Sequence, residues 1–119
     1  MKIKMIPNLS QGGNNPSGIS RVVEAYYKYL PMFGVEFTDG DDYDLSVVHA
    51  GVTGANCDVA VLHGIYFTAD YESSGYEYKS NEKIVRALRS AKQITVPSYW
   101  VSEILQRDMR ITPFVVPHG

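Results

Sequence analysis

Two short stretches decide the fold: "LSVVH" (Leu45–His49) and "VAVLH" (Val59–His63). Both are almost continuously apolar, and both are rich in β-branched valine. Strands of this kind are typical of a parallel sheet that helices cover on both faces, because a sheet with one wet face shows strict polar and apolar alternation instead. The two stretches therefore predict strands of a mainly parallel sheet.

The rest of the chain alternates between strand-like and helix-like segments. Four further runs have strand character: Lys2–Ile6, Val35–Phe37, Ile94–Val96 and Phe114–Val116. Apolar residues at helical spacing predict three helices, over residues 19–30, over about Ser80 to Ala91, and after Pro97 and Ser98. Ser17 or Ser20 is expected to cap the first helix, and Gly34 stands just beyond its end. This order predicts one three-layer α/β domain over residues 1–119, in which ligands bind beyond the carboxyl ends of the strands.

The composition is that of an ordinary globular domain. Of the 119 residues 45% are apolar and 20% are charged, and no run approaches the roughly 18 apolar residues of a membrane-spanning helix. The start "MKIKMIPNLS" lacks the apolar stretch of a signal peptide, so a cytoplasmic location is expected. The net charge of −2 argues against a nucleic-acid partner. The single cysteine, Cys57, cannot form an internal disulfide and is expected to be a structural residue.

A glycine-rich stretch, "LSQGGNNPSGISRVV" (Leu9–Val23), lies between the first strand and the first helix. Gly12, Gly13 and Gly18 precede a helix whose N-terminal N–H groups favour an anion. The spacing matches neither the dinucleotide pattern G-x-G-x-x-G nor the P-loop, so Walker-type hydrolysis is not expected. Spacing alone leaves two interpretations open, an anion-binding loop and a flexible turn.

Three histidines stand at or near the ends of strand-like runs: His49, His63 and His118. In a parallel sheet all three lie on the carboxyl edge, where an imidazole can hydrogen-bond a sugar or a phosphate. A three-histidine metal site lacks a supporting carboxylate motif, and each histidine taken alone is more often structural. His63, which Gly64 follows, is the strongest candidate for a ligand contact.

The acidic stretch "DGDDYD" (Asp39–Asp44) contains the pattern D-x-D twice. In a metal-dependent class of sugar-nucleotide transferases, such paired carboxylates bind a divalent cation together with the nucleotide phosphate. Here the stretch precedes a strand instead of following one, and it lacks the glycine and glutamate offsets of a calcium loop. A solvated, turn-forming acidic loop is the preferred interpretation, and no metal ligands are assigned.

Two neighbouring segments carry candidate partner contacts. The long connection over residues 64–81 holds aromatic side chains that either stack on an acceptor or pin the loop to the domain; those assigned to a candidate acceptor loop are Tyr66, Phe67 and Tyr71. Basic residues then line the polar side of the second predicted helix: Lys79, Lys83, Arg86, Arg89 and Lys92. The basic face of helix 80–92 either is simply solvated or makes peripheral contact with an anionic membrane.

Taken in order, several motifs resemble the N-terminal domain of retaining GT-B glycosyltransferases, in particular the family 4 group. They are "MKIKMI…GG…SGISRVVEAYYKYL", "YDLSVVH", "VAVLHG", "AKQITVPSYWVSEIL" and "FVVPHG", and together they span nearly the whole chain. The resemblance implies a Rossmann-like, acceptor-side domain of a retaining hexosyltransferase that uses a nucleotide sugar and needs no cofactor or obligatory metal. It also implies that a donor-binding C-terminal half, in the same or a separate chain, lies outside this sequence, and that the chain is inactive alone.

The resemblance assigns roles to individual residues. Gly12 and Gly13 match the glycine loop near the donor diphosphate and the acceptor, and His63 matches the histidine that contacts the transferred sugar, which makes it the catalytic candidate. Ser98 matches a strand-end serine that lines the cleft, and His118, also assigned to donor binding, stands where the family usually has asparagine. Two alternatives remain: a non-catalytic Rossmann-like module that binds a sugar or nucleotide or docks a partner chain, and a metal-dependent transferase that uses the D-x-D pairs.

Overall fold

The computed structural model describes residues 1–6, 18–51, 53, 55–65 and 75–117. Its strands are β1 (Lys2–Ile6), β2 (Glu36–Phe37), β3 (Leu45–Ala50), β4 (Val59–Leu62), β5 (Gln93–Val96) and β6 (Phe114–Val115). Its helices are α1 (Gly18–Tyr29), the short 3₁₀ helix η1 (Leu30–Phe33), α2 (Gly75–Ser90) and α3 (Tyr99–Met109). Each strand expected from the sequence is present, within one or two residues of its expected bounds.

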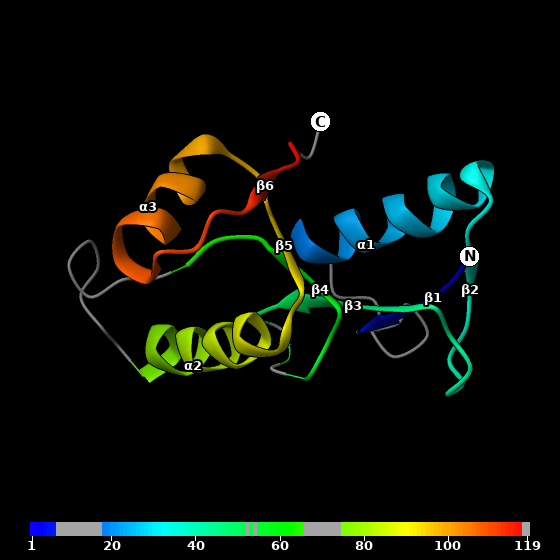
Figure 1. Ribbon diagram of the computed structural model, residues 1–119, viewed down its shortest axis with the longest axis horizontal. Helices are drawn as coiled ribbons and strands as arrows, with labels where there is room; N and C mark the ends of the chain where they lie inside the picture. Colours follow the sequence, from blue (N-terminus) through cyan, green and yellow to red (C-terminus); the bar gives the residue numbers. More distant parts are fainter. Residues whose placement is uncertain (7–17, 52, 54, 66–74, 118–119) are drawn as a thin grey trace.

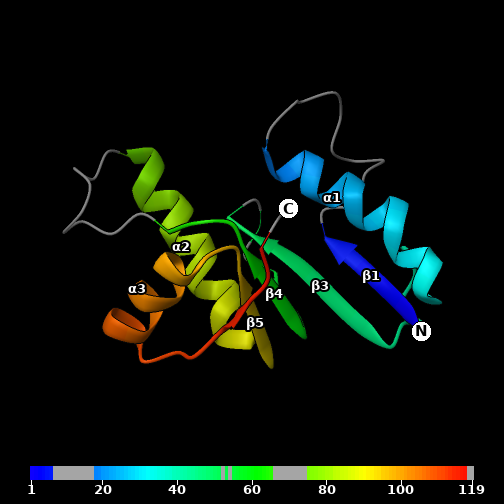
Figure 2. The ribbon, with the colours of Figure 1, turned by 90° about the horizontal axis from the view of Figure 1, so that it is seen from above.

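The strands form one six-stranded, all-parallel sheet in the order β2-β1-β3-β4-β5-β6 (Figures 1 and 2). The central register pairs Met5 with Val47, Val47 with Val59, and Val59 with Gln93. The predicted parallel sheet is confirmed, and the arrangement is Rossmann-like. The apolar runs of β3 and β4 are thus explained by their central position, since strands on both sides and helices on both faces exclude water from them.

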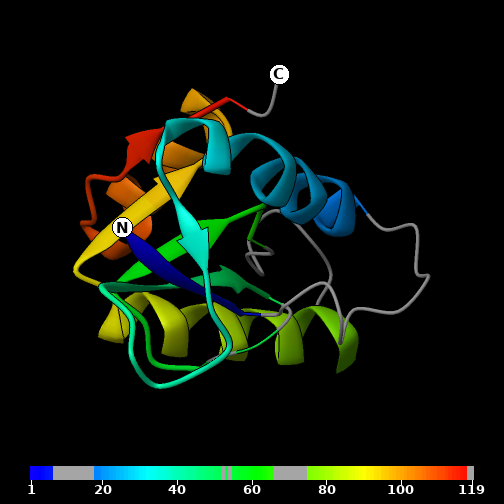
Figure 3. The same ribbon diagram turned by 90° about the vertical axis from the view of Figure 1, so that its right-hand side faces the viewer.

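Two apolar cores, one on each face, hold the three layers together. On one face α1 covers a cluster that includes Met5, Val23, Val47 and Val61. On the other face α2 and α3 cover a larger cluster built around residues with 0% exposure: Val48, Ala60, Leu62, Ala87 and Leu105. Figure 3 shows α1 and α2 on opposite sides of the sheet. Successive side chains of β3 and β4 therefore point into opposite cores, which is why these strands show no alternation of polar and apolar residues.

The helix ends follow local chemistry. α1 continues directly into η1, which contains Pro31. Gly34 ends η1 with a positive φ of 84°, as expected for the glycine just beyond a helix. α2 starts at Gly75, earlier than the predicted Ser80, because its first turns are polar and carry no apolar stripe for the sequence pattern to reveal. α3 begins directly after Ser98.

The strand order also defines where a ligand would meet the sheet. The connection that leaves β1 runs through α1 to β2 on one side of it, whereas β3 leads to β4 on the other side. Neighbouring strands whose connections diverge in this way leave a crevice beyond their carboxyl ends. The carboxyl ends of β1 and β3 are therefore the edge where the site residues are to be sought. None of the described helices is long and apolar enough to cross a membrane.

Candidate functional site

Two of the three histidines meet at this edge. His49 is the second-last residue of β3, and His63 follows β4 directly. Their rings stack with centroids 5.2 Å apart, and His49 Nδ1 lies 2.9 Å from His63 Nε2. The two side chains differ in access, because His49 is 0% exposed whereas His63 is only half-buried. A ligand would therefore reach this pair through His63.

Residues of β1 and α1 close around the buried member of the pair. The sulfur of Met5 lies 3.1 Å from His49 Nε2, and Met5 is itself 2% exposed. The ring of Tyr26, on α1, lies 5.6 Å from the His49 ring. Burial raises the pKa of the Tyr26 hydroxyl, so this residue is neutral near pH 7. His49, on β3, is thus contacted by side chains of β1 and α1, while His63 is the more accessible member of the pair.

Ser98, the other predicted site residue that the structure describes, has a defined structural role. Its side chain accepts a hydrogen bond from the backbone N–H of Val101 at 3.3 Å, which makes it the N-cap of α3. The serine that was assigned to the cleft by resemblance therefore serves the helix that follows β5. Its contact with a donor stays a prediction.

The remaining predicted site residues, Gly12, Gly13, Tyr66, Phe67, Tyr71 and His118, lie outside the described residues. The interpretations of the glycine loop and of the acceptor loop therefore stay predictions.

The acidic loop lies at the opposite edge of the sheet. It precedes β3, Asp41 and Asp42 are exposed, and they form ion pairs of 3.6 and 3.7 Å with Lys4 and Lys2 of β1. The Asp44 carboxylate accepts a hydrogen bond from the backbone N–H of Lys2 at 2.7 Å. The described residues contain no group of three or more His, Cys, Asp or Glu side chains that could hold a metal ion. These contacts agree with a solvated turn. Because the loop precedes β3 whereas His63 follows β4, the D-x-D pairs and His63 lie at opposite edges of the sheet.

A groove that sequence reasoning missed lies between α1 and the residues that follow β6. It has a volume of about 390 Å³ and is mostly apolar; its lining residues are Arg21, Val22, Ala25, Tyr26, Tyr29, Leu30, Val116 and Pro117. Tyr29 and Val116 are 50% and 42% exposed.

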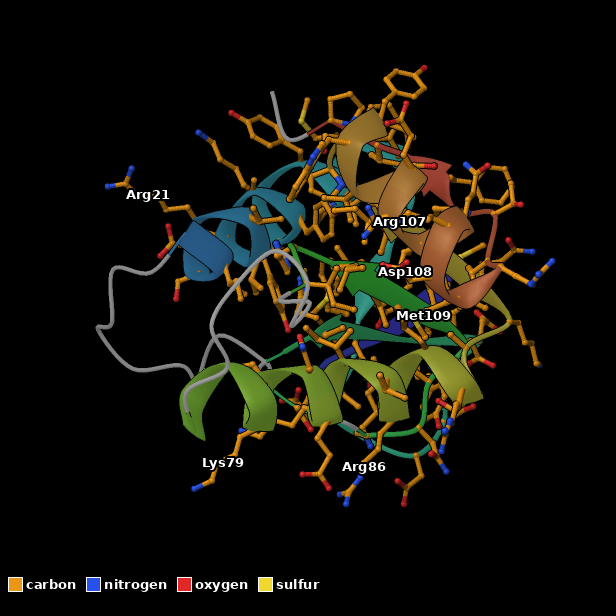
Figure 4. All side chains as sticks on the ribbon, turned by 90° about the vertical axis from the view of Figure 1, so that its left-hand side faces the viewer. Arg21, Lys79, Arg86, Arg107, Asp108 and Met109 are labelled. Atoms are coloured by element: carbon orange, nitrogen blue, oxygen red, sulfur yellow. The ribbon has the colours of Figure 1, made fainter. Side chains whose placement is uncertain are left out.

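The basic face of α2 points away from the sheet. Figure 4 shows Lys79 and Arg86 extending outward from α2. Arg86 donates to Glu82 at 2.8 Å, one turn earlier on the same helix, and Lys92 lies 3.4 Å from Asp58. The expected basic face is thus exposed on α2 at Lys79, Lys83, Arg86 and Arg89, whereas Lys92 lies after the end of this helix at Ser90.

Comparison with protein-family models, with curated proteins and with solved structures finds no match to this chain. The fold and the histidine pair therefore rest on the structure, and the glycosyltransferase assignment rests on the motif resemblance.

Proposed function

We propose that this chain is the acceptor-side Rossmann-like domain of a retaining, nucleotide-sugar-dependent hexosyltransferase and is inactive alone. The observation that carries the proposal is the position of His63. This half-buried histidine follows β4 at the carboxyl edge of an all-parallel sheet, and its ring contacts the buried His49. The family motifs assign the sugar contact to the same residue.

The proposal divides the chemistry among a few residues. His63 orients the transferred hexose, while backbone N–H groups at Gly12 and Gly13 stabilise the charge that develops on the leaving diphosphate. Ser98 and His118 line the donor side, and Tyr66, Phe67 and Tyr71 contact the acceptor. The nucleotide itself is held by the second half, so no cofactor or obligatory metal is assigned to this chain.

The proposal places the enzyme in the cytoplasm, with the exposed basic face of α2 available for peripheral contact with an anionic membrane. A nucleic-acid partner is not proposed, because the net charge of −2 lacks the basic excess that such domains usually carry.

A titration with nucleotide hexoses tests this division of labour. Because nucleotide binding is assigned to the other half, calorimetry with the isolated chain should show weak binding or none with uridine-, guanosine- or adenosine-diphosphate hexoses. Micromolar affinity for any of them would contradict the proposal. A second check is the gene sequence after codon 119 and in the adjacent reading frame, since the proposal expects a second Rossmann-like half with a basic pair and a glutamate pair in the same or in a separate chain.

The groove along α1 favours a second candidate, a non-catalytic module that docks a partner chain or binds a sugar or nucleotide. Exposed apolar surface of this kind, here at Tyr29 and Val116, marks interaction sites in many proteins. The two candidates differ in one result. A module keeps its binding in the absence of any donor-binding half, whereas the transferase domain requires that half for turnover.

A further inference from the structure

α1 carries apolar side chains on its groove side as well as on the side that it buries in the core. Val23 and Tyr27 pack in the cluster between α1 and the sheet. Val22, Ala25 and Tyr29 follow one another at intervals of three and four residues, so they share a neighbouring side of the helix, where they line the groove. Packing against the sheet therefore accounts for only one of the two apolar sides.

The sheet is open to solvent next to this groove. Val61 pairs with Thr95, and Thr95 pairs with Phe114. Laterally paired side chains point to the same face of a sheet, and Val61 belongs to the core beneath α1. Phe114 is nevertheless 62% exposed, and Val116, two residues further along, is 42% exposed. The described helices thus leave an apolar surface uncovered beside α1.

The solvent edge of the groove is positively charged. Arg21 is exposed and lines the groove, and Figure 4 shows it extending away from α1. Lys28 lies two turns later, with its Nζ 5.0 Å from the centre of the Tyr29 ring. Glu24, the acid between them in sequence, is not among the lining residues. Neither cation forms a salt bridge with another described residue, so both charges are available to an occupant of the groove.

We propose that the groove binds an amphipathic helix of a partner protein, with apolar residues on one side and acidic residues next to them. Val22 and Tyr29 are seven residues apart, which is about 10 Å along α1. A helix that presents apolar side chains at i, i+3 or i+4 and i+7 spans the same length. Val116 and Pro117 form the opposite wall for these side chains, and the acidic residues meet the two cations at the edge.

The charge pattern favours such a partner over a second copy of this chain. In a two-fold symmetric dimer the same surface meets itself. Two copies of α1 packed antiparallel through Ala25 would bring Arg21 of one copy next to Lys28 of the other, and like charges placed together oppose binding. The proposal goes beyond the transferase chemistry and does not depend on it. It gives the docking alternative described above a partner of defined chemistry.

A designed helical peptide of about 20 residues tests the proposal, since shorter isolated helices are marginal in water. The probe carries leucine at i, i+3 and i+7 with glutamate beside these positions, and the comparison peptide carries lysine in place of glutamate. Fluorescence polarisation should show about tenfold tighter binding of the glutamate peptide. Amide NMR shifts on adding it should fall on α1 and on residues 114–117. Equal affinities, no binding of the glutamate peptide, or shifts confined to α2 would overturn the proposal.

Charge reversal at the edge supplies the matched comparison. Arg21→Glu combined with Lys28→Glu should reverse the preference, so that the lysine peptide binds more tightly than the glutamate peptide. Lys83→Glu combined with Arg89→Glu changes the net charge equally on α2 and should keep the preference of the parent protein. All four side chains are exposed, so both variants should fold, which circular dichroism checks. The same loss of glutamate-peptide binding in both variants would contradict the proposal, because it would then reflect net charge alone.

Two other occupants of the groove would also be detected. A dimer of the chain alone that Ala25→Arg dissociates in sedimentation equilibrium would assign the groove to a second copy. Binding to phosphatidylserine vesicles that the same substitution abolishes would assign it to a lipid surface. Either result would overturn the proposal. None of these measurements uses a nucleotide sugar, so a negative result here leaves the transferase proposal intact, and failure of donor turnover leaves the proposed helix site intact.

Discussion

The N-cap of α3 offers a quantitative test, because Ser98 has been given both a structural and a ligand-binding role. Ser98→Ala removes the acceptor for the Val101 N–H, and Val101 is only 4% exposed, so water replaces the lost partner poorly. Loss of an N-cap costs about 0.5–2 kcal/mol. Since the hydrogen bond is long, at 3.3 Å, the lower half of that range applies, and we expect a loss of about 1 kcal/mol in the free energy of unfolding.

Urea denaturation followed by circular dichroism measures this loss. With a slope of about 1–3 kcal/mol per molar urea, the midpoint of Ser98→Ala should fall by roughly 0.3–1 M. Ser98→Asp is the matched control, because it keeps an acceptor and places a negative charge at the N-terminus of α3, so its midpoint should stay near that of the parent protein. An unchanged midpoint in Ser98→Ala would refute the capping argument. Ser98 would then have only its proposed role in donor binding.

Three further predictions follow from other contacts. Leu105→Ala, at a position with 0% exposure in the larger core, should lower the free energy of unfolding by about 2–5 kcal/mol in the same urea assay. Gly34→Ala should cost about 1–2 kcal/mol because φ is 84° there, while Gly34→Asn, which tolerates that conformation better, should cost less. Hydrogen bonds from the backbone and hydroxyl of Ser46, followed by Lys92, hold the pKa of Asp58 below its ordinary value. This lowered pKa contributes stability above the unfolded pKa of about 3.9 that is lost as the pH falls through the folded pKa, and Asp58→Asn should flatten the acid limb of a thermal melt against pH.

The strands could be predicted from the sequence because burial on both faces requires nearly continuous apolar residues. Val47 and Val48 point to different cores, so β3 needs apolar residues at consecutive positions. The start of α2 was not readable, because its first turns carry no apolar stripe at helical spacing. The structural role expected for Cys57 agrees with its burial, 7% exposed against α2, where desolvation raises the pKa of its thiol.

The candidate site was readable only in part. The sequence predicted that His49 and His63 share one edge, since each closes a strand-like run. Their contact requires that β3 and β4 are neighbouring strands with His49 paired to Val61. Local sequence patterns do not predict the order of strands in a sheet, so the contact could not be predicted. Met5 carried no signal at all, because a methionine in an apolar strand is indistinguishable from any other core residue. The groove along α1 was missed for a similar reason: it arises where residues after β6 come to lie beside a helix far away in the chain.

The most direct test of the proposed function is donor turnover by this chain together with its donor-binding half, from the same or a separate chain, measured as release of nucleoside diphosphate from a panel of nucleotide hexoses. We predict turnover of at least one donor, reduced by roughly 100-fold in His63→Ala because the sugar is no longer held in its reactive orientation. Arg110→Ala, an exposed position at the far end of α3, is the control and should retain full turnover. Absence of turnover with every donor, or undiminished turnover in His63→Ala, would contradict the assignment of this domain and of its histidine.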